Sequence, residues 1–434
     1  MSRAAVNTSR SSELYARALR LLPGGVNSPV RAMRSIGRAP IFIASGRGSR
    51  IRDVDGNQYV DWVSSWGPLI LGHAHPEVIE AVIKAARSGT SFGAPTEGEV
   101  ELAAEVAKRV PSVQMLRMTS SGTEATMSAI RLARAVTGSE PVLEFAGAYH
   151  GHVDGLLAEA GSGLATQGIP ASPGVLAAAT SATVIVPWND PPALVAATER
   201  HRLAAILAEP VPANMGLVEP EPGFLELLRE RADATGALLV FDEVITGFRV
   251  ARGGAQAHFG LTPDLTILGK IVGGGLPAAA YGGPRALMER IAPAGDVYQA
   301  GTLSGNPLAV AAALATLARL DGEAYRRLAK LTEALAAGLR AVAAEAGRTV
   351  QVHSLPGLLT VFFSDAPVTD YESAAACDLV AYGAWCRALL DRGIYPPPSQ
   401  FEAWFPSLAH TDEDMQRTLD AAREAFRERP EEAA

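Results

Sequence analysis

Short apolar runs alternate with helical stretches through the middle of this chain, between about residues 76 and 320. Continuous apolar runs separated by helices predict parallel strands that are buried on both faces of a sheet. The runs lie at residues 142–145, 183–186, 204–208, 238–241 and 265–268. A sheet of this kind binds ligands at the carboxyl ends of its strands. Glu209, Asp242 and Lys270 fall at such ends. The sequence therefore predicts an α/β fold with a mostly parallel central sheet and helices on both faces.

Changes of pattern along the chain predict three domains. Residues 1–75 form an N-terminal segment, with a helix at 11–22 followed by short antiparallel strands that turn at Asp55-Gly56. Residues 76–320 form the large α/β domain. Residues 321–434 form a smaller C-terminal α+β domain, with a strand at 358–363 and a frayed tail.

Composition excludes several classes of protein. The chain has 434 residues, a net charge of −8 and 48% hydrophobic residues, without the basic excess of a nucleic-acid binder. Its two cysteines, Cys377 and Cys386, are too few for a disulfide framework and fit small core positions. No signal-peptide core or membrane-length apolar run is evident, so the sequence predicts a soluble cytoplasmic protein with no membrane partner.

Lys270 is the main candidate for chemistry. It follows one apolar run and precedes Gly273-Gly274-Gly275, while Asp242 ends another run. A lysine and a carboxylate at neighbouring strand ends suit pyridoxal phosphate, because the amine forms a Schiff base and the carboxylate pairs with the pyridine nitrogen. The alternative for the isolated residues is a solvated loop lysine and a turn aspartate.

A second segment has the features of an anion site. Ser121 and Glu124 fit a capping box, and the small residues Gly122 and Thr123 leave helix N-terminal amides free for a phosphate. An ordinary capped helix is the alternative. Tyr149 follows the 142–145 run and is a candidate to stack on a cofactor ring.

Metal binding is not predicted. His150 and His152 lie two residues apart without cysteine or acidic companions, which makes a weak ligand set.

Together these segments resemble the class III pyridoxal phosphate-dependent aminotransferases, of fold type I, over nearly the whole chain. The family signature corresponds to residues 238–244 and 263–270. Further resembling runs lie at residues 23–31, 91–97, 121–131, 149–152 and 300–307. Pro212-Ala213 departs from the Ala-Gly usual before Asn214 and stiffens the approach to that residue.

The resemblance implies a role for each matched residue. Lys270 would be the Schiff-base lysine and Asp242 the pyridinium partner, with Tyr149 stacked on the ring. Ser121, Gly122 and Thr123 would bind the phosphate, completed by Thr302 of the neighbouring subunit in a homodimer. The substrate pocket would contain Ser28, Arg31, Trp66, Ser162, Asn214, Tyr298 and Glu402, with Arg31 on the substrate carboxylate.

The resemblance also implies an activity. The runs are most similar to the branch of the family that converts (S)-4-amino-5-oxopentanoate to 5-aminolevulinate for tetrapyrrole biosynthesis. The cofactor would cycle through pyridoxamine 5′-phosphate, and a glutamyl-tRNA reductase would supply the aldehyde. An ω- or β-amino acid aminotransferase is the alternative within the fold, and a non-catalytic cofactor-binding scaffold is the alternative outside enzymes. Residues 151–180, rich in Gly, Ala, Ser and Pro, suggest a mobile lid or a plain surface insertion.

Overall fold

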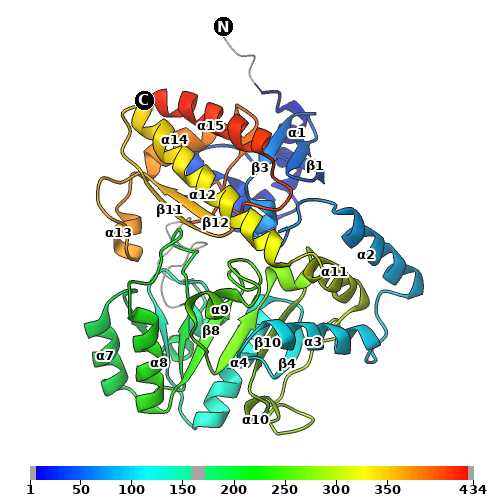
Figure 1. Cartoon of the computed structure of the whole chain (residues 1–434), viewed down its shortest axis with the longest axis vertical. Helices are drawn as coiled ribbons and strands as arrows, with labels where there is room; N and C mark the ends of the chain where they lie inside the picture. Colours follow the sequence, from blue (N-terminus) through cyan, green and yellow to red (C-terminus); the bar gives the residue numbers. More distant parts are fainter. Residues whose placement is uncertain (1–5, 158–171, 429–434) are drawn as a thin grey trace.

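A seven-stranded sheet forms the centre of the computed structural model, which describes residues 6–157 and 172–428 (Figure 1). Its spatial order is β4 (Met115–Thr119), β10 (Ala279–Gly283), β9 (Leu265–Leu268), β8 (Leu238–Glu243), β7 (Ala205–Ala208), β5 (Val142–Phe145) and β6 (Thr183–Val186). Strands β5 to β9 run parallel, whereas β10 is antiparallel to both of its neighbours. The predicted α/β fold with a mostly parallel sheet is confirmed.

Successive side chains of the parallel strands enter two different cores. In β8, Leu239 and Phe241 pack with helices α7 (Pro191–Arg200) and α8 (Phe224–Thr235) on one face, whereas Val240 packs with helix α4 (Gly122–Thr137) on the other. The period of two explains why the runs are apolar throughout, because both faces of the sheet are covered. The large-domain helices are α2 (Pro76–Ser88), α3 (Glu97–Arg109), α4 (Gly122–Thr137), α6 (Ala177–Thr180), α7 (Pro191–Arg200), α8 (Phe224–Thr235), α9 (Gly254–Phe259), α10 (Arg285–Met288) and α11 (Pro307–Leu317).

The two ends of the chain share a second body, seen above the central sheet in Figure 1. Strands β1 (Ile43–Arg47), β2 (Arg50–Asp53) and β3 (Gln58–Asp61) are antiparallel, and β13 (Ile394–Tyr395) extends their sheet parallel to β3. Trp62 lies in the same core as Trp385, Trp404 and Phe426. The remaining elements are α1 (Ser9–Ala18), α12 (Gly322–Glu345), β11 (Gln351–Leu355), β12 (Leu358–Phe362), α13 (Tyr371–Ala375), α14 (Leu379–Leu390) and α15 (Asp412–Arg427). The three domain boundaries stay a prediction.

Helix α1 begins and ends earlier than the sequence pattern suggests. The Asp55 carboxylate, from the β2–β3 turn, accepts the amides of Arg10 and Ser11 at 2.6 and 2.9 Å. A distant side chain thus satisfies first-turn donors and moves the helix start, a contact that local sequence does not reveal. Within the described ranges, no helix is both long enough and apolar enough to cross a membrane.

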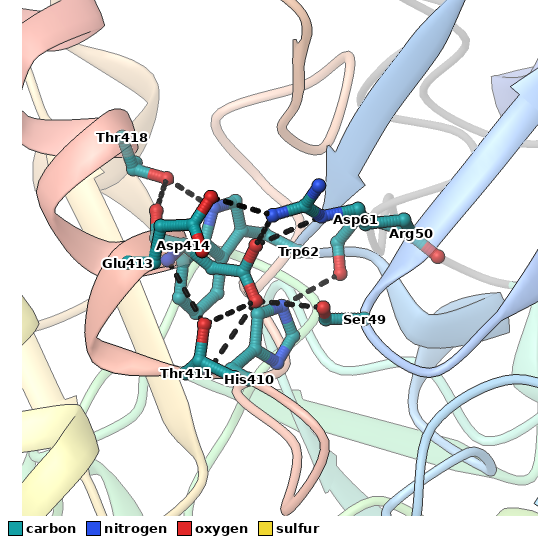
Figure 2. A network of polar contacts seen from close by, with 9 residues as sticks. All are labelled: Ser49, Arg50, Asp61, Trp62, His410, Thr411, Glu413, Asp414 and Thr418. Atoms are coloured by element: carbon teal, nitrogen blue, oxygen red, sulfur yellow. Dashed lines mark hydrogen bonds and ion pairs between the residues drawn. The ribbon is translucent and has the colours of Figure 1, made fainter.

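A buried polar network joins the N-terminal sheet to α15 (Figure 2). Asp414 accepts hydrogen bonds from Ser49 Oγ at 2.7 Å and from Arg50 Nη2 at 3.0 Å. The His410 ring stacks on Trp62 with centroids 3.9 Å apart. Its Nδ1 accepts the Ser407 amide at 3.0 Å, so its Nε2 carries the proton and donates to the Asp61 carbonyl at 3.1 Å. The site holds a neutral imidazole.

This neutral imidazole makes stability depend on pH. Burial lowers the pKa of His410 to about 4, although the charges of Asp61 and Asp414 oppose the shift. The unfolded chain takes up a proton near pH 6.5, so the stabilisation present above that pH is lost as the pH falls towards 4. We expect His410→Gln to remove this part of the pH dependence of the free energy of unfolding, which amounts to about 3 kcal/mol between pH 7 and 4. Urea unfolding across that range measures it. His201→Gln is the control, and parallel curves for wild type and His410→Gln would contradict the expectation.

Candidate active site

Lys270 lies two residues beyond β9, at the start of the short helix η6 (Lys270–Gly273). Its backbone has a φ of 48°, in the left-handed region that non-glycine residues rarely adopt. Burial lowers the pKa of its amine, against the opposing charges of Glu402, Asp242 and Glu209. A strained backbone and a reactive amine in a cavity are typical of a functional lysine.

Asp242 points into the same cavity and is held from two sides. Its Oδ1 accepts the Val244 amide at 3.0 Å, and its Oδ2 is 2.8 Å from Nδ1 of His150. Burial opposes protonation of His150, but Asp242, followed by Glu209 and Glu144, outweighs it and raises the histidine pKa. The Val244 amide and the His150 ring thus hold the Asp242 carboxylate in one orientation at the cavity, with His150 as its side-chain proton donor.

Glu209, directly after β7, organises the opposite wall. One of its carboxylate oxygens accepts the Tyr149 amide at 3.0 Å. The other accepts the Ala213 amide at 3.1 Å and Nδ2 of Asn214 at 2.8 Å. Burial raises the pKa of Glu209, and the Asp242 charge adds to the rise. The His150 charge and the hydrogen bonds from Tyr149 and Asn214 oppose it. Despite the proline at 212, Asn214 is therefore fixed at the cavity edge by this carboxylate.

The predicted capping box at the start of α4 is confirmed. Ser121 Oγ accepts the Glu124 amide at 3.3 Å, and Glu124 Oε2 accepts the amides of Ser120 and Ser121 at 2.7 and 3.0 Å. Gly122 and Thr123 follow in the first turn and line the cavity. The helix thus presents its positive end and small side chains to whatever binds there.

These elements enclose a cavity of about 310 Å³. Its wall includes seven of the predicted residues: Ser121, Gly122, Thr123, Tyr149, Asn214, Asp242 and Lys270. A helix N-terminus suits a phosphate, a carboxylate suits a pyridinium nitrogen, and an amine suits a carbonyl carbon. A Cβ at Gly151 would lie 2.5 Å from Thr123 Oγ1, so the backbone passes close to the anion cradle. The donor set fits a phosphorylated pyridine aldehyde.

The structure places two more predicted residues beside this cavity. Trp66 ends the turn η4 (Ser64–Trp66), whose three residues all have positive φ, and Gly67 after it approaches Lys270. Glu402 is near enough for its charge to raise the pKa of Tyr149, after the larger effect of burial.

Other predicted residues lie elsewhere in the single chain. Ser28 and Arg31, at η2 (Pro29–Ala32), do not line the described cavity, and Arg31 is exposed. Tyr298 is 72% exposed, and Thr302 is also exposed. Ser162 and residues 158–171 of the suggested lid lie outside the described residues. The roles assigned to all of these residues stay predictions.

His150 and Glu209 are site residues that the sequence analysis did not assign. Glu209 was visible as a strand-end carboxylate, and His150 as a neighbour of Tyr149. His150 meets Asp242 from 92 residues away, and Glu209 accepts the Tyr149 amide from 60 residues away, so the chain alone does not show these contacts. His152 also has a partner at this site, since its Nδ1 lies 3.2 Å from Thr123 Oγ1.

The sheet, the strand-end carboxylate and the cavity lysine define a pyridoxal phosphate-dependent transferase fold of type I. The chain belongs to the class III aminotransferase family, whose model matches residues 32–426. It is 55% identical over 421 residues to the glutamate-1-semialdehyde 2,1-aminomutase of Desulfitobacterium hafniense, covering 96% of this chain and 98% of the relative. It is 56% identical over 425 residues to the enzyme of the same name from Roseiflexus castenholzii, covering 97% and 98%.

Solved structures show the same fold. An omega-transaminase from Sphaerobacter thermophilus superposes with a TM-score of 0.90 and 35% identity, covering 97% of this chain and 99% of the other. A glutamate-1-semialdehyde aminomutase from Pseudomonas aeruginosa, in complex with PMP, gives a TM-score of 0.85 and 29% identity, covering 96% and 94%. The predicted family is confirmed.

Proposed function

We propose that this chain converts (S)-4-amino-5-oxopentanoate, or glutamate 1-semialdehyde, to 5-aminolevulinate, a step of tetrapyrrole biosynthesis. The observation that carries the proposal is 55% identity over 96% of the chain to a relative named glutamate-1-semialdehyde 2,1-aminomutase. The reaction moves an amino group within one substrate, so the enzyme is a pyridoxal phosphate-dependent isomerase.

The cofactor would be pyridoxal 5′-phosphate, with its pyridoxamine form in the cycle. When bound, it supplies an electron-poor ring that stabilises negative charge on the adjacent substrate carbon. Ser121, Gly122 and Thr123 would hold its phosphate, Asp242 its ring nitrogen, and Tyr149 one face of its ring. These roles suit the cavity wall, where an anion cradle and a carboxylate stand with the amine of Lys270.

Lys270 would move the protons. Because burial lowers its pKa, the amine has a larger neutral fraction near neutral pH than a solvated lysine has. A neutral Nζ can accept a proton from a substrate carbon and return it to another position. His150 and Asp242, hydrogen-bonded at 2.8 Å, would keep the carboxylate oriented during this transfer.

The substrate's remaining groups would meet Ser28, Trp66, Ser162, Asn214, Tyr298 and Glu402, with Arg31 on its carboxylate. A guanidinium suits a carboxylate because it donates two parallel hydrogen bonds. Asn214 is already oriented at the cavity by Glu209.

A homodimer would complete the site. Tyr298, Thr302 and Leu303 are exposed together before α11, an unfavourable place for apolar and aromatic groups unless another surface covers them. A second copy would cover this loop and receive Thr302 at its phosphate site. The dimer would work in the cytoplasm and take its unstable aldehyde from a glutamyl-tRNA reductase.

Turnover without any second substrate tests the proposed function. The purified cofactor-loaded protein is incubated with glutamate 1-semialdehyde and no added amine or keto acid, and 5-aminolevulinate is assayed. We expect sustained product formation over many turnovers, because donor and acceptor are the same molecule.

An ω- or β-amino acid aminotransferase is the second candidate, supported by the TM-score of 0.90 to the omega-transaminase. Its reaction uses the same amine and carboxylate but consumes a separate donor and acceptor. Turnover that appears only when an amine and a keto acid are both supplied would favour this candidate and overturn the mutase.

A further inference from the structure

Arg249, in the segment between β8 and α9, is a buried cation without a carboxylate. Its side chain is among the largest that are fully buried. Its guanidinium donates to the carbonyls of Gly357 at 3.0 Å and Pro406 at 3.2 Å, and also to that of Gly67. Throughout the described stretches, no acidic side chain lies within ion-pair distance of it.

Burying this charge costs free energy that carbonyl dipoles offset only in part. The Phe405 ring, 5.1 Å from the guanidinium carbon, adds a cation–π contact. Nε nevertheless has no hydrogen-bond partner among the described residues. A neutral side chain of similar size would fill the space without the desolvation cost. Filling space therefore does not explain why a charged residue occupies position 249.

Gly67 connects Arg249 to the active site. Its carbonyl binds the guanidinium, while a Cβ on its α-carbon would lie 3.4 Å from Cδ of Lys270 and 2.8 Å from Phe405. One residue of backbone therefore separates the buried cation from the methylene chain of the lysine. Gly67 also directly follows the turn that ends at Trp66. The three residues of that turn all have positive φ, a strained conformation that contacts with the surrounding structure must hold in place.

We propose that Arg249 is a positioning residue for Lys270. Its three carbonyl bonds tie the Gly67 segment, the β11–β12 turn and the Pro406 turn together against the lysine. Its uncompensated positive charge, behind that segment, favours the neutral form of the amine. The proposal rests on the proposed function only in taking Lys270 as the reactive amine.

The charges around Lys270 fit this role. Burial is the main reason that its pKa is lowered, and Arg249 acts in the same direction. The carboxylates of Glu402, Asp242 and Glu209 all oppose it. Helix α11, which packs on η6, carries no charged side chain. The guanidinium thus adds a smaller contribution to that of burial, in opposition to the three carboxylates.

Trace acetylation of the full-length chain, freed of cofactor, measures the amine directly. The chain has four lysines, Lys84, Lys108, Lys270 and Lys330, so peptide mass spectrometry resolves each one. We expect Arg249→Met and Arg249→Gln to reduce acetylation of Lys270 relative to exposed Lys330 at pH 8 by about three- to tenfold. Arg249→Lys, which keeps the charge, should restore the wild-type ratio even where its melting temperature is lowered.

Arg109→Met is the matched control. Its guanidinium is 6% exposed and binds Glu105 and the Leu320 carbonyl, so its loss should affect stability without moving the Lys270 ratio. An unchanged ratio in a folded neutral variant at 249 would overturn the proposal. If neither neutral variant folds, the wild-type pH profile decides, because a Lys270 that titrates together with Lys330 would also overturn it. None of these outcomes depends on which reaction the enzyme catalyses.

Discussion

Lys270→Ala is expected to abolish the visible absorption that the reconstituted protein gives when the cofactor is linked to lysine. We also expect 5-aminolevulinate formation to fall by about 10²–10⁴-fold or more, because the residue that transfers protons is removed. Absorption spectra with added pyridoxal 5′-phosphate and initial rates with glutamate 1-semialdehyde measure the two effects. The cavity itself should persist, since its walls come from six other strand ends and turns around the lysine.

Lys330→Ala separates the chemical effect from a general loss of lysine. Lys330 is exposed on α12, away from the cavity, and its loss should change neither absorption nor rate. With four lysines in the chain, each can be replaced in turn. Persistence of the absorption band in Lys270→Ala would reject Lys270 as the cofactor-linked residue.

The parallel half of the sheet was predictable because both of its faces are covered. Strands β5, β6 and β9 coincide with predicted apolar runs, because most of their apolar side chains enter cores on the two faces of the sheet. Val142, Leu265 and Ile267 enter one core, whereas Leu143, Phe145 and Val186 enter the other. The pattern missed β4 and β10. Strand β4 carries Arg117, whose guanidinium binds the Ala292 carbonyl, and β10 ends in two glycines with weak strand propensity. These strands form by pairing with each other, which no local pattern reveals.

The sequence predicts those site residues whose type is required by the chemistry. It does not predict those whose role depends on tertiary contacts. Asp242 and Lys270 stand out because each lies at the carboxyl end of a buried apolar run, where sheets of this kind bind ligands. His150 and Arg249 act through partners 92 and 182 residues away in sequence, Asp242 and Gly67. A buried histidine and a buried arginine look like ordinary residues until those contacts are known.

Asp242→Asn is expected to slow 5-aminolevulinate formation by about 10²–10³-fold, the usual loss when a preorganised charge is removed. The amide keeps the shape of the carboxylate, and the Val244 amide still finds an oxygen acceptor. His150 can adapt by carrying its proton on Nε2 and accepting from the new amide through Nδ1. The variant should therefore fold and bind cofactor, while the cofactor ring nitrogen loses the anion that keeps it protonated.

Asp233→Asn is the matched control, because Asp233 is an exposed partner of Arg229 on α8 and lies outside the cavity wall. Circular dichroism and the cofactor absorption of Asp242→Asn test whether fold and lysine linkage survive. The His150 pKa, raised by Asp242 in the wild type, should fall in the variant, which NMR titration of the imidazole measures. A full rate in Asp242→Asn would mean that the carboxylate charge is not used, and the ring nitrogen would then need another partner.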